Sequence, residues 1–145
     1  MSITNINFKN YSLGDIMKYF IVGNKYSGVH ELALELSNYY RLEIFNVNST
    51  NNINEINKIV RENKEWIIEG TIIDNVDVLC NLSEIIIFLD YSNDGFFKKK
   101  IDDEFNSNEV LKLLQKHIRK GIIIRNKRQL KKYLKMVYES DRYNF

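Results

Sequence analysis

The stretch KYFIVGNKYSGVH, residues 18–30, decides the fold. Its apolar first part predicts a buried strand, and a helical pattern begins at its end. Between them, Gly23 and Gly28 have the spacing of G-x-x-x-x-G-K-[ST], a loop whose backbone N–H groups cradle phosphate. Val29 stands where the lysine belongs, and His30 where the hydroxyl that binds Mg²⁺ belongs. The stretch therefore predicts a nucleotide-binding fold with altered phosphate chemistry.

The composition is that of one globular domain. The chain has 145 residues, of which 44% are hydrophobic and 28% charged, and its net charge of +2 does not by itself indicate nucleic-acid binding. Cys80 is the one cysteine, which excludes an intramolecular disulfide and favours a reducing, cytoplasmic setting. No apolar run approaches the roughly 20 residues that span a bilayer, and the N-terminus lacks a signal-peptide pattern, so we expect no membrane partner.

Beyond that stretch, apolar runs alternate with helical patterns. Residues 1–16 are polar and form a predicted N-terminal extension, and residues 17–145 form the predicted domain. Helical periodicity and cap residues mark the helices, and short apolar runs mark the strands. We predict strands at 18–22, 42–47, 65–69, 84–89 and 121–125, and helices at 29–40, 52–62, 94–120 (broken near 106–108) and 127–139, with a short helix or turn at 73–79.

This alternation predicts the fold class. The strands are continuous apolar runs rather than alternating ones, so both faces of the sheet are expected to be covered. A parallel five-stranded sheet with helices on both faces is an α/β three-layer sandwich. Ligands of such sheets bind beyond the carboxyl ends of the strands, where the loop after Gly23 lies.

With these segments placed, the chain resembles the small P-loop kinases of the nucleoside-monophosphate-kinase type. It is most similar to the DNA topology modulation (FlaR-like) and adenylate-kinase-related group, over about residues 17–137. The resemblance rests on the loop at residues 21–28, on Trp66-Ile67-Ile68-Glu69-Gly70, on the run at 85–90 and on residues 122–128. It implies the sheet order 2-3-1-4-5, an acidic group near Mg²⁺ at Glu69, and adenine near Arg125.

The resemblance also implies a ligand site. ATP, GTP or phosphate with Mg²⁺ would be its cofactor. Glu69 is the candidate catalytic, metal-linked carboxylate, although a polar residue at a strand end is an equally good interpretation. The implied nucleotide-binding residues are Gly23, Asn24, Lys25, Tyr26, Ser27, Gly28, Val29, His30 and Arg125.

Several catalytic parts of that family are missing. Lysine follows the transferring phosphoryl group and the Ser/Thr hydroxyl holds Mg²⁺, and Val29 can do neither. At a helix N-terminus the dipole disfavours a protonated His30. The stretch 91–105, where the family carries lid arginines, has only the lysines 98–100 beside acidic residues, and a solvated helix face explains these best.

The remaining polar residues have simpler interpretations. Asp90 is expected to form a turn or cap a helix. His117 is expected at the surface of the long helix, and Cys80 in the core. Lysines and arginines after Arg125 form a basic C-terminal stripe, which is expected to be an exposed helix face or a surface for an acidic partner.

Three functional hypotheses remain open. The first is a degenerate P-loop kinase-like protein, a binding or interaction module with little or no phosphoryl transfer. The second is an active nucleotide or nucleoside kinase, or an NTPase, in which Lys25, lysines 98–100 and Glu69 replace the lost groups. The third is a docking factor for an RNA-containing or protein assembly. A homodimer through tyrosine-rich surfaces is consistent with the 12% aromatic content.

Overall fold

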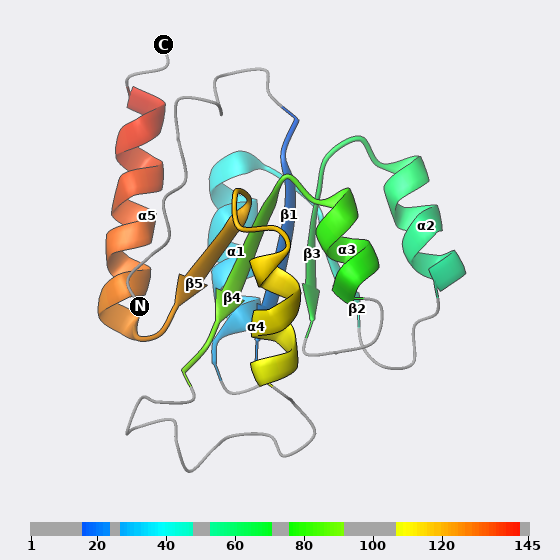
Figure 1. Ribbon diagram of the computed structural model, residues 1–145. Helices are drawn as coiled ribbons and strands as arrows, with labels where there is room; N and C mark the ends of the chain where they lie inside the picture. Colours follow the sequence, from blue (N-terminus) through cyan, green and yellow to red (C-terminus); the bar gives the residue numbers. More distant parts are fainter. Residues whose placement is uncertain (1–15, 24–26, 48–52, 71–75, 92–106, 143–145) are drawn as a thin grey trace.

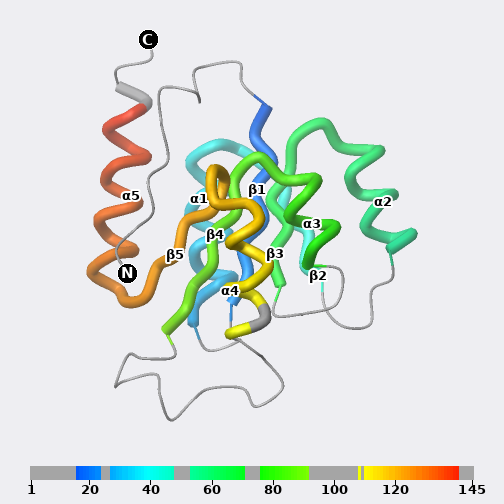
Figure 2. Tube along the Cα trace, in the orientation of Figure 1, coloured from blue at the N-terminus to red at the C-terminus, as the bar shows by residue number. Residues whose placement is uncertain are grey.

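The computed structural model describes residues 16–23, 27–47, 53–70, 76–91 and 107–142. Residues 1–15 of the predicted extension, loop residues 24–26 and the lysines at 98–100 lie outside these ranges. Strands and helices alternate along the whole described chain (Figures 1 and 2). In order they are β1 Lys18–Gly23, α1 Val29–Tyr40, β2 Ile44–Val47, α2 Ile53–Glu62, β3 Trp66–Gly70, α3 Val76–Leu82, β4 Ile85–Leu89, α4 Ser107–Gln115, β5 Gly121–Ile124 and α5 Lys127–Arg142.

The five strands form one parallel sheet in the order β2-β3-β1-β4-β5. The predicted α/β class and the order 2-3-1-4-5 are therefore confirmed. β1 lies in the centre, with Phe20 beside both Ile68 of β3 and Ile86 of β4. The order reverses at β1, because the chain first places β2 and β3 on one side of it and then β4 and β5 on the other. In open α/β sheets, ligands bind beyond the carboxyl ends of the strands at such a reversal.

Helices cover both faces of the sheet, as its continuous apolar strands predict. One core cluster joins α1 and α5 to alternate strand residues such as Ile21 and Ile87. The other joins α2, α3 and α4 to the intervening residues such as Phe20 and Phe88. In Figure 1, α3 and α4 lie in front of the sheet and α1 lies behind it. Among the described residues, no helix is long and apolar enough to cross a membrane.

The long helix predicted at 94–120 is wrong at its C-terminal end. α4 ends at Gln115, and residues 116–120 form a turn tightened by hydrogen bonds from Lys116 N to Leu113 O and from His117 N to Leu114 O. The chain must reverse here so that Gly121 can pair with Ile86. The predicted break near 106–108 instead coincides with the start of α4.

The turn also changes the position of His117. Its side chain is only 12% exposed, and Nε2 lies 3.7 Å from Asp77 Oδ1 on α3. The prediction of a surface position on a long helix is therefore wrong. Cys80 is buried, as predicted.

Candidate functional site

The candidate site lies where β1, β3 and the start of α1 meet. Gly23 ends β1 and Gly70 ends β3, and the two strands pair side by side. α1 begins at Val29, after the loop that follows β1. The parallel strands end at the same edge of the sheet as the N-terminus of α1, where the helix dipole favours anions.

Both loop glycines are required by the backbone. A Cβ at Gly23 would lie 2.9 Å from the Leu89 carbonyl oxygen and 2.7 Å from Ser27 Oγ. Gly28 is the N-cap of α1 and has φ of 84°, a left-handed conformation that side chains rarely adopt. Both glycines therefore serve the strand-to-helix turn, whether or not a ligand binds there.

Val29 belongs to the hydrophobic core. It is 6% exposed and packs in the cluster that also holds Ile21 and Leu32. The position that carries the phosphate lysine in the motif is thus filled by an inward-facing aliphatic side chain.

His30 pairs with Glu69. The distance from His30 Nδ1 to Glu69 Oε1 is 2.7 Å, with the imidazole 60% exposed and the carboxyl side chain 2% exposed. A carboxylate accepts hydrogen bonds, so Nδ1–H of His30 is the donor in this contact. The contact joins the first turn of α1 to the end of β3.

Asn46 completes this cluster from β2. Its Nδ2 donates to the same Glu69 Oε1 over 3.1 Å. The second carboxylate oxygen, Oε2, is buried and has no hydrogen-bond partner among the described residues. We call Asn46, Glu69 and His30 the carboxylate cluster. A carboxylate that orients an exposed imidazole is the arrangement of a general base and its positioning group.

The carboxylate cluster does not suit Mg²⁺. Magnesium takes oxygen ligands in a near-octahedral arrangement, whereas this cluster supplies an imidazole at the hydroxyl position and one carboxylate, of which Oε1 already accepts two hydrogen bonds and Oε2 alone accepts none from the described residues. In the described part of the chain, no group of three or more His, Cys, Asp or Glu residues is placed to hold a metal ion. We therefore derive no metal-dependent step for this site.

Arg125 lies elsewhere on the same edge, separated from Glu69 by β1 and β4. Its Nη1 lies 2.9 Å from Asp90 Oδ2, and its backbone N–H donates to Gln129 Oε1 over 2.7 Å. Asp90 is 2% exposed, so the expectation of a turn former or helix cap overlooked a buried ion pair. The positions of the two charges along their strands indicate this ion pair. Leu89 and Ile124 pair in register, and each directly precedes one of the two charged residues.

The described structure thus divides the predicted catalytic and nucleotide-binding residues into separate groups. His30 and Glu69 come together, and Ser27 packs beside Gly23, where it is 4% exposed. Arg125 belongs to a second cluster with Asp90. The sequence-based reasoning missed Asn46, whose signal was its place at the end of a strand next to β3. Comparison of the chain with protein-family models, curated proteins and solved structures returned no match.

Proposed function

We propose that this protein is a binding module with the architecture of a P-loop kinase and without efficient phosphoryl transfer. Its ligand would be a nucleotide or another phosphate-bearing molecule, held by the backbone N–H groups at the start of α1. One observation carries the proposal: the two residues at the lysine and hydroxyl positions of the motif are committed to other contacts. Val29 packs in the core and His30 bonds Glu69.

Transfer of a phosphoryl group depends almost entirely on positioned positive charge, from a lysine and from Mg²⁺. Val29 supplies none, and the carboxylate cluster does not suit the metal. Backbone N–H groups and the helix dipole still favour an anion at the N-terminus of α1, which supports binding more than catalysis.

Ligand titration tests both halves of the proposal. Thermal-shift and calorimetric titrations with ATP, GTP, their monophosphates and inorganic phosphate would be run at saturating concentrations, with and without Mg²⁺. We expect stabilisation that does not depend on Mg²⁺, and no release of phosphate from ATP. Mg²⁺-dependent binding together with consumption of the γ-phosphate would refute the proposal in favour of an active kinase or NTPase.

Two variants sharpen this test. His30→Ser releases Glu69 and restores a hydroxyl, and Val29→Lys with His30→Ser also restores the lysine. We expect triphosphate affinity to rise and to become Mg²⁺-dependent in the variants. Leu34→Lys is the matched control, because it adds the same charge at an exposed position of α1. Equal affinity in all four proteins would argue against a phosphate site at this loop.

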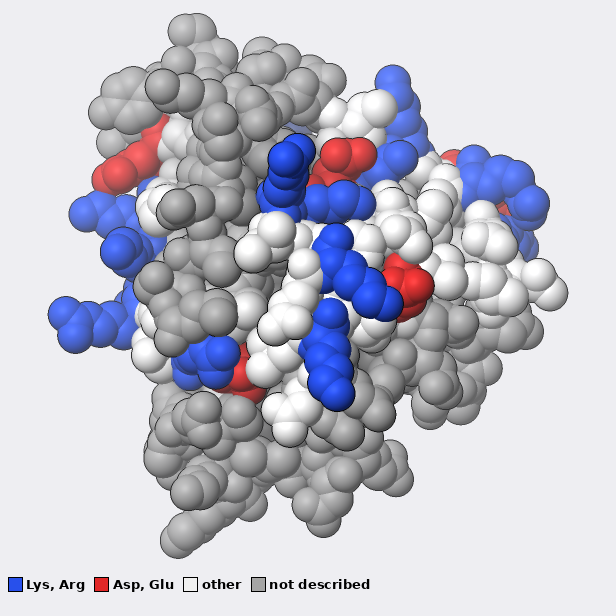
Figure 3. Space-filling view, viewed as in Figure 1, with Lys and Arg blue, Asp and Glu red and all other residues white. Residues whose placement is uncertain are grey.

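A second candidate function, docking to an acidic partner, rests on α5. Among the α5 residues whose burial is described, the exposed basic side chains are Lys127, Arg128, Lys131, Lys132 and Lys135. Lys and Arg side chains project at the left edge of Figure 3, where α5 lies in Figure 1. Binding of an RNA oligonucleotide with a steep salt dependence, lost in the Lys131→Gln, Lys132→Gln, Lys135→Gln variant, would support this function. Salt-independent or unchanged binding would argue against it.

A further inference from the structure

His30 combines an exposed imidazole with a buried partner. It lies in the first turn of α1, and its side chain is 60% exposed, whereas that of Glu69 is 2% exposed. Its Nδ1–H donates to Glu69 Oε1 over 2.7 Å, and Asn46 Nδ2 holds the same oxygen over 3.1 Å. Because Nδ1 carries the hydrogen, the neutral form of the ring has its lone pair on Nε2. The carboxylate cluster therefore fixes which ring nitrogen can act as a nucleophile.

The second histidine of the chain provides a contrast. His117 is 12% exposed, and its Nε2 lies 3.7 Å from Asp77 Oδ1, beyond the distance of a hydrogen bond. His30 instead keeps most of its side chain in solvent while a buried carboxylate holds one of its nitrogens. A histidine with this exposure and a fixed tautomer is available to react with a small electrophile.

The position of His30 in α1 selects the electrophile. The N-terminus of a helix favours negative charge, and this effect is confined to the first turn. A phosphoryl group on Nε2 brings about two negative charges to this end of α1. An acyl or alkyl group brings none and gains nothing from the helix. The position therefore favours phosphorylation over other modifications of the ring.

Glu69 supports the same reaction from the other ring nitrogen. Attack by Nε2 leaves the hydrogen on Nδ1, so the phosphorylated ring carries a positive charge. The carboxylate that accepts the Nδ1–H bond stabilises this charge as it develops. Within the described ranges, no lysine or arginine is paired with Glu69, so no other cation there neutralises its charge.

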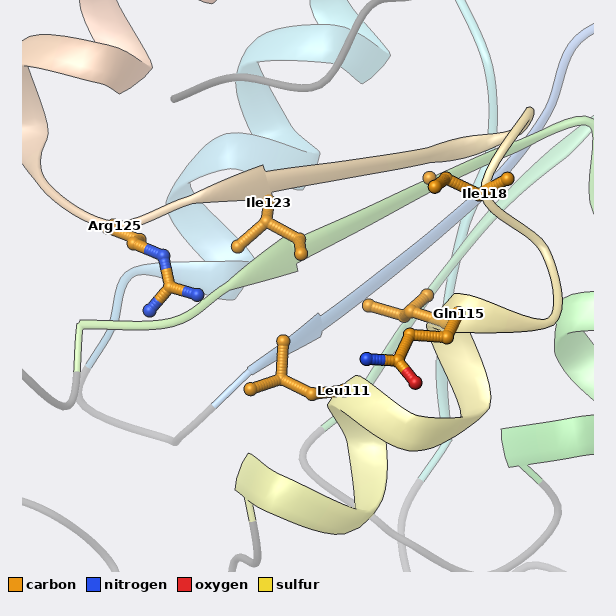
Figure 4. A pocket seen from close by; sticks show the side chains of 7 residues that line it. Leu111, Gln115, Ile118, Ile123 and Arg125 are labelled. Carbon is orange, nitrogen blue, oxygen red and sulfur yellow. The ribbon is translucent and has the colours of Figure 1, made fainter. Parts of the chain in front are cut away.

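The described surroundings of His30 do not favour ATP as the phosphoryl donor. Transfer from ATP depends on positioned positive charge, but Val29 packs in the core and the carboxylate cluster does not suit Mg²⁺. Arg125 is bonded to Asp90 and lies beside Ile123, where a pocket opens between α4 and β5 (Figure 4). A phosphoramidate needs neither a lysine nor a metal, because its protonated nitrogen leaves as a neutral amine.

We propose that Nε2 of His30 is a phosphorylation site that accepts its phosphoryl group from a phosphoramidate, a donor with a P–N bond. The Nε2 lone pair forms the new N–P bond while the P–N bond of the donor breaks, and the amine leaves with that electron pair. The amine keeps the hydrogens of its ammonium form and Nδ1 keeps its own, so no proton is transferred. Glu69 is a positioning residue in this reaction.

The inference rests on the proposed function in one respect, the preference of the start of α1 for a phosphate-bearing group. It goes beyond that function because His30 itself becomes bonded to the phosphoryl group and no nucleotide takes part. The two can fail separately, since titration measures reversible binding and phosphorylation is covalent.

Incubation of the full chain with potassium phosphoramidate, without Mg²⁺ or nucleotide, tests the proposal. Intact mass gives the number of phosphoryl groups, and fragmentation that preserves the P–N bond gives their position. ³¹P NMR distinguishes the Nε2 isomer of phosphohistidine from the Nδ1 isomer. We expect one phosphoryl group, on Nε2 of His30, and none on His117 over the same time.

Asn38→His provides the matched control in an otherwise unmodified chain. It places a second exposed imidazole on α1, in the last turn rather than the first. Phosphorylation of His30 should be at least about tenfold faster than that of the introduced imidazole, the factor expected for one hydrogen bond to a charged group. This comparison does not require any change at Glu69.

Glu69→Gln separates the charge of this residue from its hydrogen bond. The amide oxygen still accepts from Nδ1–H, so ¹⁵N spectra of the imidazole should show the same tautomer as in the unmodified protein. The rate of phosphorylation should nevertheless fall at least about tenfold, because the charge that stabilises the phosphorylated ring is gone. A role limited to holding the ring would leave this rate unchanged.

The outcomes are distinct. Equal rates at His30 and at the introduced imidazole overturn the proposal, and so does formation of the Nδ1 isomer. An unchanged rate in Glu69→Gln overturns the role of its charge. Binding of phosphate or nucleotide without phosphorylation of His30 overturns this inference alone. Phosphorylation of His30 without any such binding supports the inference and overturns only the function proposed above.

Discussion

Replacing Arg125 by methionine tests whether the pair with Asp90 is a buried structural contact. The substitution keeps a long aliphatic side chain and removes the guanidinium that lies 2.9 Å from Asp90 Oδ2. Removing one partner of a buried ion pair costs about 3–5 kcal/mol, because the other charge stays buried without compensation. Asp90 is 2% exposed but Arg125 is 21% exposed, so water reaches one side of the pair. We therefore expect the low end, a loss of about 3 kcal/mol in the free energy of unfolding.

Urea denaturation measures this loss through the midpoint at unchanged slope. In thermal unfolding, about 3 kcal/mol corresponds to a fall of roughly 6–12 °C in Tm for a chain of this size. Arg128→Met is the control, because it removes the same charge from an exposed position and should change stability by less than about 0.5 kcal/mol. In the Asp90→Asn background, Arg125→Met should cost much less. Equal losses of stability in Arg125→Met and Arg128→Met would show that the pair with Asp90 does not stabilise the fold.

Three further predictions concern other parts of the molecule. Burial, aided by the nearby charge of Asp77, raises the pKa of the Cys80 thiol to about 12. Near pH 8 this thiol should therefore react with DTNB only as fast as the protein unfolds. Rapid reaction of the native protein would contradict the burial of Cys80. Burial, with the hydrogen bond to Glu35, raises the pKa of Tyr138 from 10.0 to about 12. The folded state therefore binds the phenolic proton of Tyr138 more tightly than the unfolded state does. The resulting stabilisation is complete below pH 10 and is lost as the pH rises through 12. Phenolate absorbance should show a lower pKa for Tyr138 in Glu35→Gln. Ile56→Ala, at the fully buried residue of α2, should cost about 2–5 kcal/mol in urea unfolding, and a loss below about 1 kcal/mol would show that α2 is loosely packed.

The strands of the sheet could be predicted because each is a short run of mainly apolar residues in the sequence. Residues 85–89 form an uninterrupted apolar run, and all five are buried between helices on the two faces. The end of α4 was not predictable from local patterns, because residues 116–120 are compatible with a helix. Pairing between Gly121 and Ile86 determines where the chain must turn, and that pairing joins residues far apart in the sequence.

The candidate site was predictable only in part, for a similar reason. Glu69 was named as a candidate because the resemblance implies an acidic group there, but its partners come from α1 and β2. Their meeting depends on the order of the strands and on the direction of each side chain, and residue spacing gives neither. Arg125 was assigned to a ligand, whereas its observed partner follows the neighbouring strand.

The close approach at Gly23 has a consequence for how such loops diverge. Any side chain there would collide with the backbone of β4 at Leu89, so the glycine is held in place by the sheet itself. The residues that perform chemistry in the motif are under no such restraint, and Val29 and His30 have taken other contacts here. The spacing of two glycines can therefore be maintained by the strand-to-helix turn alone, whatever the loop binds. Glycine spacing reports the backbone of such a loop, and the residue after the second glycine reports its chemistry.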